Sequence, residues 1–170
     1  MKLVAVGVMA AAGIAHAEAP AEVTALHALF RNVTWAGKTV VPRGAMPKST
    51  NGRSTCRWFL DDSAVACEME ETGLGPKAWH GLLTVGWDAD AKEYRALLVD
   101  GSGSAGVLTG RLDGGKLALT SALRATLDGK ASRFRLSWAP GDAGTIHFTE
   151  ELSLGTGAFT VSEEATMKPQ

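Results

Sequence analysis

The stretch that decides the fold runs from Trp79 to Thr120 and reads WHGLLTVGWDADAKEYRALLVDGSGSAGVLTGRLDGGKLALT. Its apolar runs are too short for helices and are rich in residue types that favour strands. Turn-forming residues separate these runs at positions 88–90, 101–103 and 113–115. Strands joined by such short turns must be antiparallel, so the stretch predicts an up-and-down sheet.

Ten strand candidates follow a single helical pattern. The strands are expected at residues 33–41, 53–60, 64–72, 79–87, 93–100, 104–112, 115–121, 131–139, 144–152 and 157–167. Apolar residues between Val23 and Phe30 recur at helical spacing, which predicts a short helix that covers a barrel mouth. A flat ten-stranded sheet would expose an apolar face and two edges, and closure removes both. We therefore expect an all-β fold, an antiparallel up-and-down β-barrel of about ten strands with one short N-terminal helix.

The first residues have the pattern of a cleavable signal peptide. A positive charge at Lys2 precedes an apolar run over residues 3–14, and Ala15-His16-Ala17 matches the A-x-A cleavage pattern. The alternative is a buried N-terminal helix, but the run lacks amphipathic spacing. We expect residues 1–17 to be removed after Ala17, and residues 18–170 to form a single barrel domain in the periplasm or outside the cell.

The charge and the apolar pattern argue against two classes of partner. The chain has 17 Lys and Arg against 18 Asp and Glu, with no basic stripe, so nucleic acid is not an expected partner. No apolar run is long enough to span a membrane.

Residues 101–106 match G-x-G-x-x-G, but the chain continues as a strand, so this loop is expected to be a hairpin turn and not a dinucleotide site.

The two cysteines are placed to face each other in a hairpin. A turn centred between Asp61 and Asp62 pairs residues whose numbers sum to 123, as those of Cys56 and Cys67 do. Directly opposed thiols are within reach of a disulfide, which export would favour. A structural Cys56–Cys67 disulfide is the expectation. Free buried thiols and a redox-active pair are the alternatives, although the second lacks a C-x-x-C motif.

Several turn and core motifs together resemble a known family. They are GWDADAKEY at 86–94, VD at 99–100, GRLDG at 110–114, and WAG at 35–37 after a helix ending in Leu29-Phe30. They resemble the bacterial domain of unknown function 1579 family, whose members are calycin-like β-barrels. The sequence departs from that pattern where Val33 replaces a glycine, Trp87 replaces a tyrosine, and residues 60–62 replace a Gly-Gly turn. Related lipocalins and nitrobindins hold apolar molecules or haem, so the resemblance implies a binding function.

Two glutamates in apolar rows are the main candidates for a functional site. Glu150 alternates with Ile146, Phe148 and Leu152, and Glu163 alternates with Phe159, Val161, Ala165 and Met167. A turn between Thr156 and Gly157 would place Glu150 directly opposite Glu163. Opposed, buried carboxyls repel each other and have raised pKa values, so they favour a cation, a shared proton or a polar ligand group. Arg95 is a conceivable partner. The alternatives are that the register exposes one of the two glutamates, that both are solvated at an end of the barrel, or that the pair serves in acid–base catalysis.

Aromatic side chains are candidates for the wall of a ligand site, with core filling as the alternative. They are Trp35, Trp58, Trp79, Trp87 and Tyr94, while Trp138 shares an inward row with Phe134 and Leu136. The histidines have no metal-ligand spacing, so no metal is expected. No cofactor is expected either, although His80 or His147 could ligate haem, and His147 is expected to point outward.

These observations favour a non-enzymatic barrel that binds a small apolar or amphipathic molecule. The alternative is a structural or interaction module with a filled barrel and no small ligand. An enzyme is the least favoured class, because no complete acid–base or nucleophile arrangement is visible in the sequence.

Overall fold

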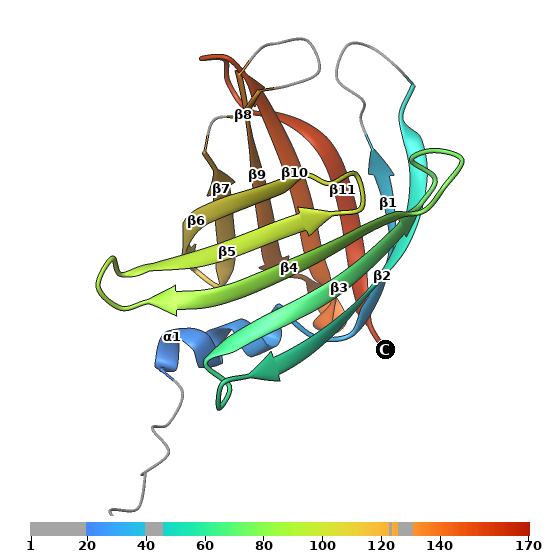
Figure 1. Cartoon of the computed structure of the whole chain (residues 1–170). Helices are drawn as coiled ribbons and strands as arrows, with labels where there is room; N and C mark the ends of the chain where they lie inside the picture. The colour runs from blue at the N-terminus through green and yellow to red at the C-terminus, as the bar shows by residue number, and fades with distance from the viewer. Residues whose placement is uncertain (1–19, 40–45, 123, 126–130) are drawn as a thin grey trace, which may run out of the picture.

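The computed structural model describes residues 20–39, 46–122, 124–125 and 131–170, and these form a closed antiparallel β-barrel (Figure 1). The strands are β1 (Val33–Thr39), β2 (Lys48–Phe59), β3 (Ala64–Thr72), β4 (Trp79–Asp88), β5 (Glu93–Asp100), β6 (Ala105–Asp113), β7 (Lys116–Ser121), β8 (Arg124–Ala125), β9 (Ala131–Pro140), β10 (Ile146–Leu154) and β11 (Thr160–Pro169). The predicted fold class is confirmed. The expected signal peptide lies outside the described residues.

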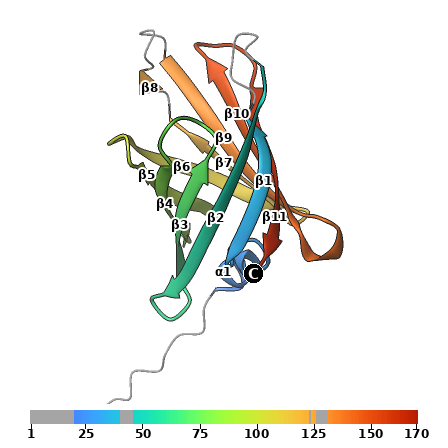
Figure 2. The same cartoon turned by 90° about the vertical axis from the view of Figure 1, so that its right-hand side faces the viewer.

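Ten strands make the ring, and the first pairs with the last. Strands β1 to β7 follow in order, β9, β10 and β11 complete the circle, and β11 pairs with β1. Figure 2 shows β1 lying between β2 and β11. The two-residue strand β8 pairs only with β9 among the described strands, beyond the end of β7. Closure in this way leaves no long unpaired edge among the described strands.

Strand β2 is longer than predicted. No strand was expected between residues 41 and 53, but β2 begins at Lys48, and residues 48–52 pair with residues 39–35 of β1. The sequence there is polar and lacks the apolar alternation that marks a strand. Pairing occurs because β1 needs a hydrogen-bonded neighbour to close the barrel. The stretch without a strand was therefore predicted wrongly from Lys48 onward.

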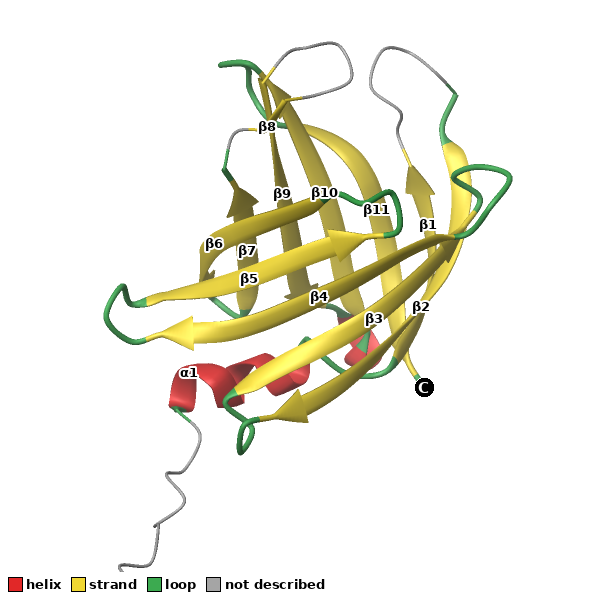
Figure 3. Ribbon diagram, viewed as in Figure 1, coloured by secondary structure: helices red, strands yellow, loops and turns green. Residues whose placement is uncertain are grey.

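A short helix closes one end of the barrel (Figure 3). It consists of α1 (Ala21–Thr24) followed by a 3-10 turn, η1 (Ala25–Ala28), and it buries Val23 and Leu26. The Tyr94 hydroxyl donates a hydrogen bond of 2.7 Å to the Glu22 carbonyl oxygen, which ties the helix to β5. The predicted helix is thus confirmed. A second 3-10 turn, η2 (Asp142–Gly144), connects β9 to β10.

The apolar core lies against this helix. Its fully buried members include Leu26, Val65, Leu83, Leu108, Leu117, Leu119 and Ile146, which come from the helix and from five strands. Trp35 also points inward, and its ring covers Gly52 so closely that an added Cβ would lie 2.1 Å from a ring carbon. A glycine is therefore required at position 52 by the packing of Trp35.

The hairpin between β2 and β3 carries the predicted disulfide. Cys56 pairs directly with Cys67, and the two Sγ atoms are bonded. The loop residues Leu60, Asp61 and Asp62 all adopt the left-handed conformation, which is costly for an ordinary side chain such as that of Leu60. The expected disulfide and the position of its turn are both confirmed.

The glycine-rich loop at 101–106 is a hairpin turn, as expected. Asp100 Oδ1 accepts hydrogen bonds from the backbone N–H groups of Ser102 and Ser104, and Gly103 adopts a positive φ of 84°. The chain then continues as β6, so no helix follows the loop. Among the helices that the structure describes, none has the length and apolar character needed to cross a membrane.

Replacing both cysteines, Cys56→Ser with Cys67→Ser, should lower the free energy of unfolding by about 2–3 kcal/mol, because the bond restricts the unfolded chain. Urea unfolding of the wild type and the variant under oxidising conditions measures this difference. Reductant should shift the wild type to the variant's midpoint and leave the variant unchanged. Equal midpoints for the oxidised wild type and the variant would contradict a stabilising bond.

Candidate functional site

Glu150 and Glu163 face each other across β10 and β11, as predicted. The register pairs Ile146 with Met167, Phe148 with Ala165, and Glu150 with Glu163. Glu163 is only 8% exposed. It pairs on its other side with Thr39, the last residue of β1, so the two carboxyls lie near the barrel end opposite the helix. The structure thus brings together the two residues that the sequence singled out.

A bulge at Ser162 ends the predicted register. Beyond Glu150, the next residue of β10 pairs with Val161, so Ser162 is an extra residue on β11. Because the extra residue reverses the alternation, Ser162 is buried and Val161 is exposed on the outside. The expectation that Val161 and Phe159 point inward was therefore wrong, and the Phe159 ring lies outside, where it contacts guanidinium groups of β9.

The bulge gives Glu150 a hydrogen-bond partner. The Ser162 hydroxyl donates to Glu150 Oε1 at 2.9 Å, and it also lies 3.2 Å from the Glu150 carbonyl oxygen. Without the extra residue, the inward position would hold valine, which offers no hydrogen bond. The irregularity therefore places a hydroxyl group beside a carboxyl that the strand register has turned toward the interior.

A third carboxyl, that of Glu71, completes the cluster and was missed by the sequence analysis. Glu71 is 5% exposed, and its side chain forms a hydrogen bond with that of Glu163. The alternation of side chains along β3 could have revealed that Glu71 faces inward. Val65 and Cys67 are buried, and Glu71 is an even number of residues away from them, so it lies on the same face of the strand. We call Glu71, Glu150 and Glu163 the carboxyl cluster.

The carboxyl cluster has perturbed electrostatics. Burial, the hydrogen bond with Glu71, and repulsion by Glu71 and Glu150 raise the pKa of Glu163 to about 9. Burial also raises the pKa of Glu150, against the opposing effect of the Ser162 hydrogen bond. Among the described residues, no Lys, Arg or His forms an ion pair with any of the three carboxyls. The cluster therefore holds at least one proton at neutral pH.

Four buried polar atoms in or beside the carboxyl cluster have no hydrogen-bond partner in the part of the chain that the structure describes. They are Thr39 Oγ1, Thr50 Oγ1, Trp35 Nε1 and Glu71 Oε1. Thr50 is 1% exposed. A Cβ added to Gly37 would lie 2.9 Å from Thr50 Oγ1 and 3.0 Å from the Ala165 Cβ, so this hydroxyl oxygen projects over Gly37 inside the barrel.

Two of the predicted aromatic residues flank Glu71, and three do not. Trp79 pairs directly with Glu71, while Gly52, the other partner of Glu71, lies beneath the Trp35 ring. Trp58, Trp87 and Tyr94 lie at the helix end instead. Trp58 stacks on His27 with ring centroids 3.8 Å apart, and Trp87 contacts Tyr94 edge-on at 5.0 Å. Of these five predicted aromatic residues, only Trp35 and Trp79 can therefore line a site at the carboxyl cluster.

Arg95 does not partner the carboxyl cluster. It lies between the buried residues Tyr94 and Ala96, so it points outward, and its Nε lies 3.0 Å from Asp88 Oδ2. The suggestion that Arg95 neutralises Glu150 and Glu163 was therefore wrong.

His80 and His147 are both exposed, as expected for His147, so neither faces the interior as a haem ligand would. No cluster of His, Cys, Asp and Glu among the described residues is arranged to hold a metal ion.

Solvent reaches inward-facing side chains at the end of the barrel that carries the carboxyl cluster. Half-buried examples are Met69, Trp79, Leu98, Phe134, Phe148 and Leu152. At the helix end, by contrast, Val23, Leu26 and Tyr94 are buried, while Trp58 and Trp87 are half-buried. The helix therefore covers one end of the barrel, and among the described residues the inward-facing side chains at the other end are partly accessible to solvent.

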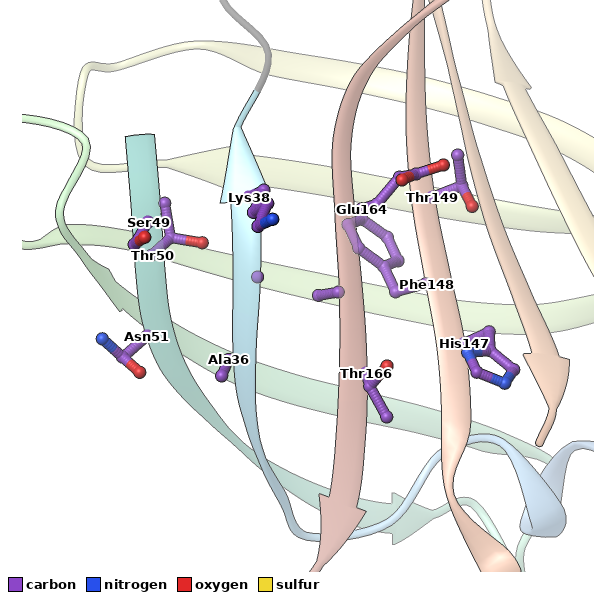
Figure 4. Close-up of a pocket in the computed structure, with 12 residues that line it drawn as sticks. Ala36, Lys38, Ser49, Thr50, Asn51, His147, Phe148, Thr149, Glu164 and Thr166 are labelled. Carbon is purple, nitrogen blue, oxygen red and sulfur yellow. The ribbon is translucent and has the colours of Figure 1, made fainter. Parts of the chain in front are cut away.

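A separate hollow of about 640 Å³ lies on the outer surface of β2, β1, β11 and β10 (Figure 4). Its exposed lining residues include Lys38, Asn51, His147 and Glu164. A second hollow of about 450 Å³ lies beside Asp88 and Arg95. Neither hollow includes a member of the carboxyl cluster.

No protein family model matches the chain, and a search of curated proteins found no match. The chemistry that the site can support follows from its own residues. Three buried carboxyls with vacant hydrogen-bond acceptors can bind a proton, a cation or a ligand rich in N–H or O–H donors.

The variant Glu163→Gln should change how stability depends on pH. The raised pKa means that native Glu163 binds a proton that the unfolded chain has lost between pH 4.5 and about 9. Its contribution to stability is fully present below pH 4.5 and is lost as the pH rises through about 9. The free energy of unfolding of Glu163→Gln, relative to that of the wild type, should thus increase by up to about 1.4 kcal/mol per pH unit in this window.

Urea unfolding at about pH 6 and about pH 8.5 measures that slope. Glu164→Gln is the matched control, because Glu164 is the neighbouring residue on β11 and is exposed. It should show no such dependence. Parallel pH profiles for the wild type and Glu163→Gln would contradict the burial of Glu163 among carboxyls.

Proposed function

We propose that this chain is an exported, calycin-like barrel that binds a small amphipathic molecule. The apolar part of the ligand would contact inward-facing aromatic and aliphatic side chains, and its polar part would meet the carboxyl cluster. The observation that carries this proposal is the polarity of the accessible end: buried carboxyls and unpartnered hydroxyls lie beneath half-buried apolar side chains. Ligand sites in proteins combine apolar walls with a few convergent polar groups in this way.

The energetics of the carboxyl cluster support a binding function. Burying carboxyls near each other destabilises a fold, and a barrel of apolar side chains alone would avoid that cost. Strongly perturbed titratable groups gather at functional sites for this reason. A ring of ten strands is also wide enough to leave interior space beyond that filled by its own side chains.

Export is part of the proposal. The pattern of residues 1–17 favours secretion or periplasmic localisation after cleavage behind Ala17. The Cys56–Cys67 disulfide supports this, because such bonds persist in oxidising compartments. The resemblance to the domain of unknown function 1579 family supports a calycin-like relationship through the motifs at 35–37, 86–94 and 110–114.

A second candidate function is that of an interaction module, and one surface favours it. Strands β4, β5 and β6 carry exposed apolar side chains on their outer face, namely Leu82, Leu97, Val99 and Val107. Leu82 pairs with Val99, and Leu97 pairs with Val107, so these residues form a continuous patch. Contiguous apolar patches of this kind mark contact surfaces for other macromolecules.

Native mass spectrometry of the protein purified from its own host tests the two candidates. The proposed function predicts a retained small molecule, which Glu71→Gln should weaken and the outer-face variant Leu97→Ser with Val107→Ser should leave unchanged. Retention of a protein partner that only the outer-face variant releases, with no small molecule bound, would favour the interaction module and contradict the proposed function.

A further inference from the structure

We infer that the polar group of the ligand is a protonated amine, bound by Glu71, Glu150 and Glu163 at the accessible end of the barrel. This inference rests on the proposed function and adds the chemical class of the ligand. It makes the site selective for a cationic amphipathic molecule over neutral or anionic molecules of the same size.

The charge distribution is the first argument. The three carboxyls come from β3, β10 and β11, and they share one interior region with no Lys, Arg or His ion-paired to them among the described residues. A buried, unpaired carboxylate is costly, so at least one of the three carboxyls keeps a proton at neutral pH, and a cation bound between them takes the place of that proton. An anionic ligand would add repulsion to the same cluster. The site therefore favours positive charge.

The vacant hydrogen-bond acceptors are the second, independent argument. Thr50 is not a carboxyl and is 1% exposed, yet its Oγ1 has no hydrogen-bond partner in the described part of the chain. Thr50 lies two residues from Gly52 on the same, inward face of β2, and Gly52 is the residue that pairs with Glu71. On its other side, Thr50 pairs with Gly37 of β1. Its hydroxyl oxygen therefore projects between Glu71 on one side and the β11 strand of Glu163 on the other.

An ammonium group fits this set of acceptors. It carries three N–H donors and no acceptor, and the site offers Thr50 Oγ1 and Glu71 Oε1 without partners, together with the carboxyls of Glu150 and Glu163. A neutral alcohol has a single donor and would leave most acceptors unpaired. A divalent metal is disfavoured, because the described carboxyls do not form a metal-binding arrangement.

The aromatic neighbours suit the same ligand. Trp35 reaches across Gly52, one partner of Glu71, and Trp79 is the other partner of Glu71. Indole rings are the preferred aromatic neighbours of an ammonium group and also contact alkyl chains. A cationic head group beside Glu71 would therefore lie between two indoles, with its apolar chain directed toward the half-buried side chains of the accessible end.

Titration of the full chain with n-octylammonium, n-octanol and n-octanoate tests the inference. Protein that native mass spectrometry shows to be free of retained molecules is titrated at about neutral pH, with tryptophan fluorescence and calorimetry as readouts. We expect n-octylammonium to bind at least about tenfold more tightly than n-octanol, the equivalent of one charge-assisted hydrogen bond. Octanoate should bind most weakly.

Glu71→Gln and Glu163→Gln should each weaken n-octylammonium binding about tenfold or more and leave n-octanol binding within about threefold. Glutamine keeps the shape of the side chain, and near-UV circular dichroism verifies that the barrel remains folded. Glu164→Gln, on the outer face beside Glu163, should leave the affinity for both probes unchanged.

The failures of this inference and of the proposed function are distinguishable. Equal affinity for n-octanol and n-octylammonium, or an equal loss of both in the glutamine variants, would overturn the assignment of an amine while supporting an amphipathic ligand. Absence of binding for all three probes would overturn both. Preferential binding of n-octanoate would overturn the charge argument alone.

Discussion

The backbone pairing of the first strand with the last is the interaction on which the rest of the structure depends. Strand β1 pairs with β11 from Val33 with Pro169 to Thr39 with Glu163, and this ladder closes the ring. Without it, the sheet would expose two edges and a large apolar face. With it, the helix has an opening to cover, and the inward-facing side chains at that end become a buried core.

Closure also creates the electrostatic character of the other end. Glu71 on β3 and Glu163 on β11 are far apart in sequence, and they meet because β1 and β2 bridge their strands in the ring. The small residue Gly37 and the hydroxyl of Thr50 lie between them, where larger apolar side chains would have separated the carboxyls. A chain selected only for stability would place apolar residues here, so the cost of the cluster supports the proposed binding function.

Much of the fold was predictable because it rests on local signals. Short turns fixed the antiparallel order, alternation fixed the inward rows, and the arithmetic of the hairpins placed Cys56 opposite Cys67 and Glu150 opposite Glu163. The site was only half predictable. The bulge at Ser162 has no glycine or proline to mark it, so Val161 was assigned to the wrong face. The start of β2 at Lys48 depends on pairing with β1, and the meeting of Glu71 with Glu163 depends on how the ring closes, which no local pattern encodes.

Three carboxyls share the interior of the barrel, and the raised pKa of Glu163 keeps this residue protonated at neutral pH. The most direct measurement is an NMR titration of the glutamate side-chain carboxyl carbons, with Glu163→Gln used to assign the resonance. The Glu163 resonance should titrate with a midpoint near 9, far above the ordinary value of 4.5. A midpoint close to 4.5 would show that Glu163 is solvated and does not lie buried among carboxyls.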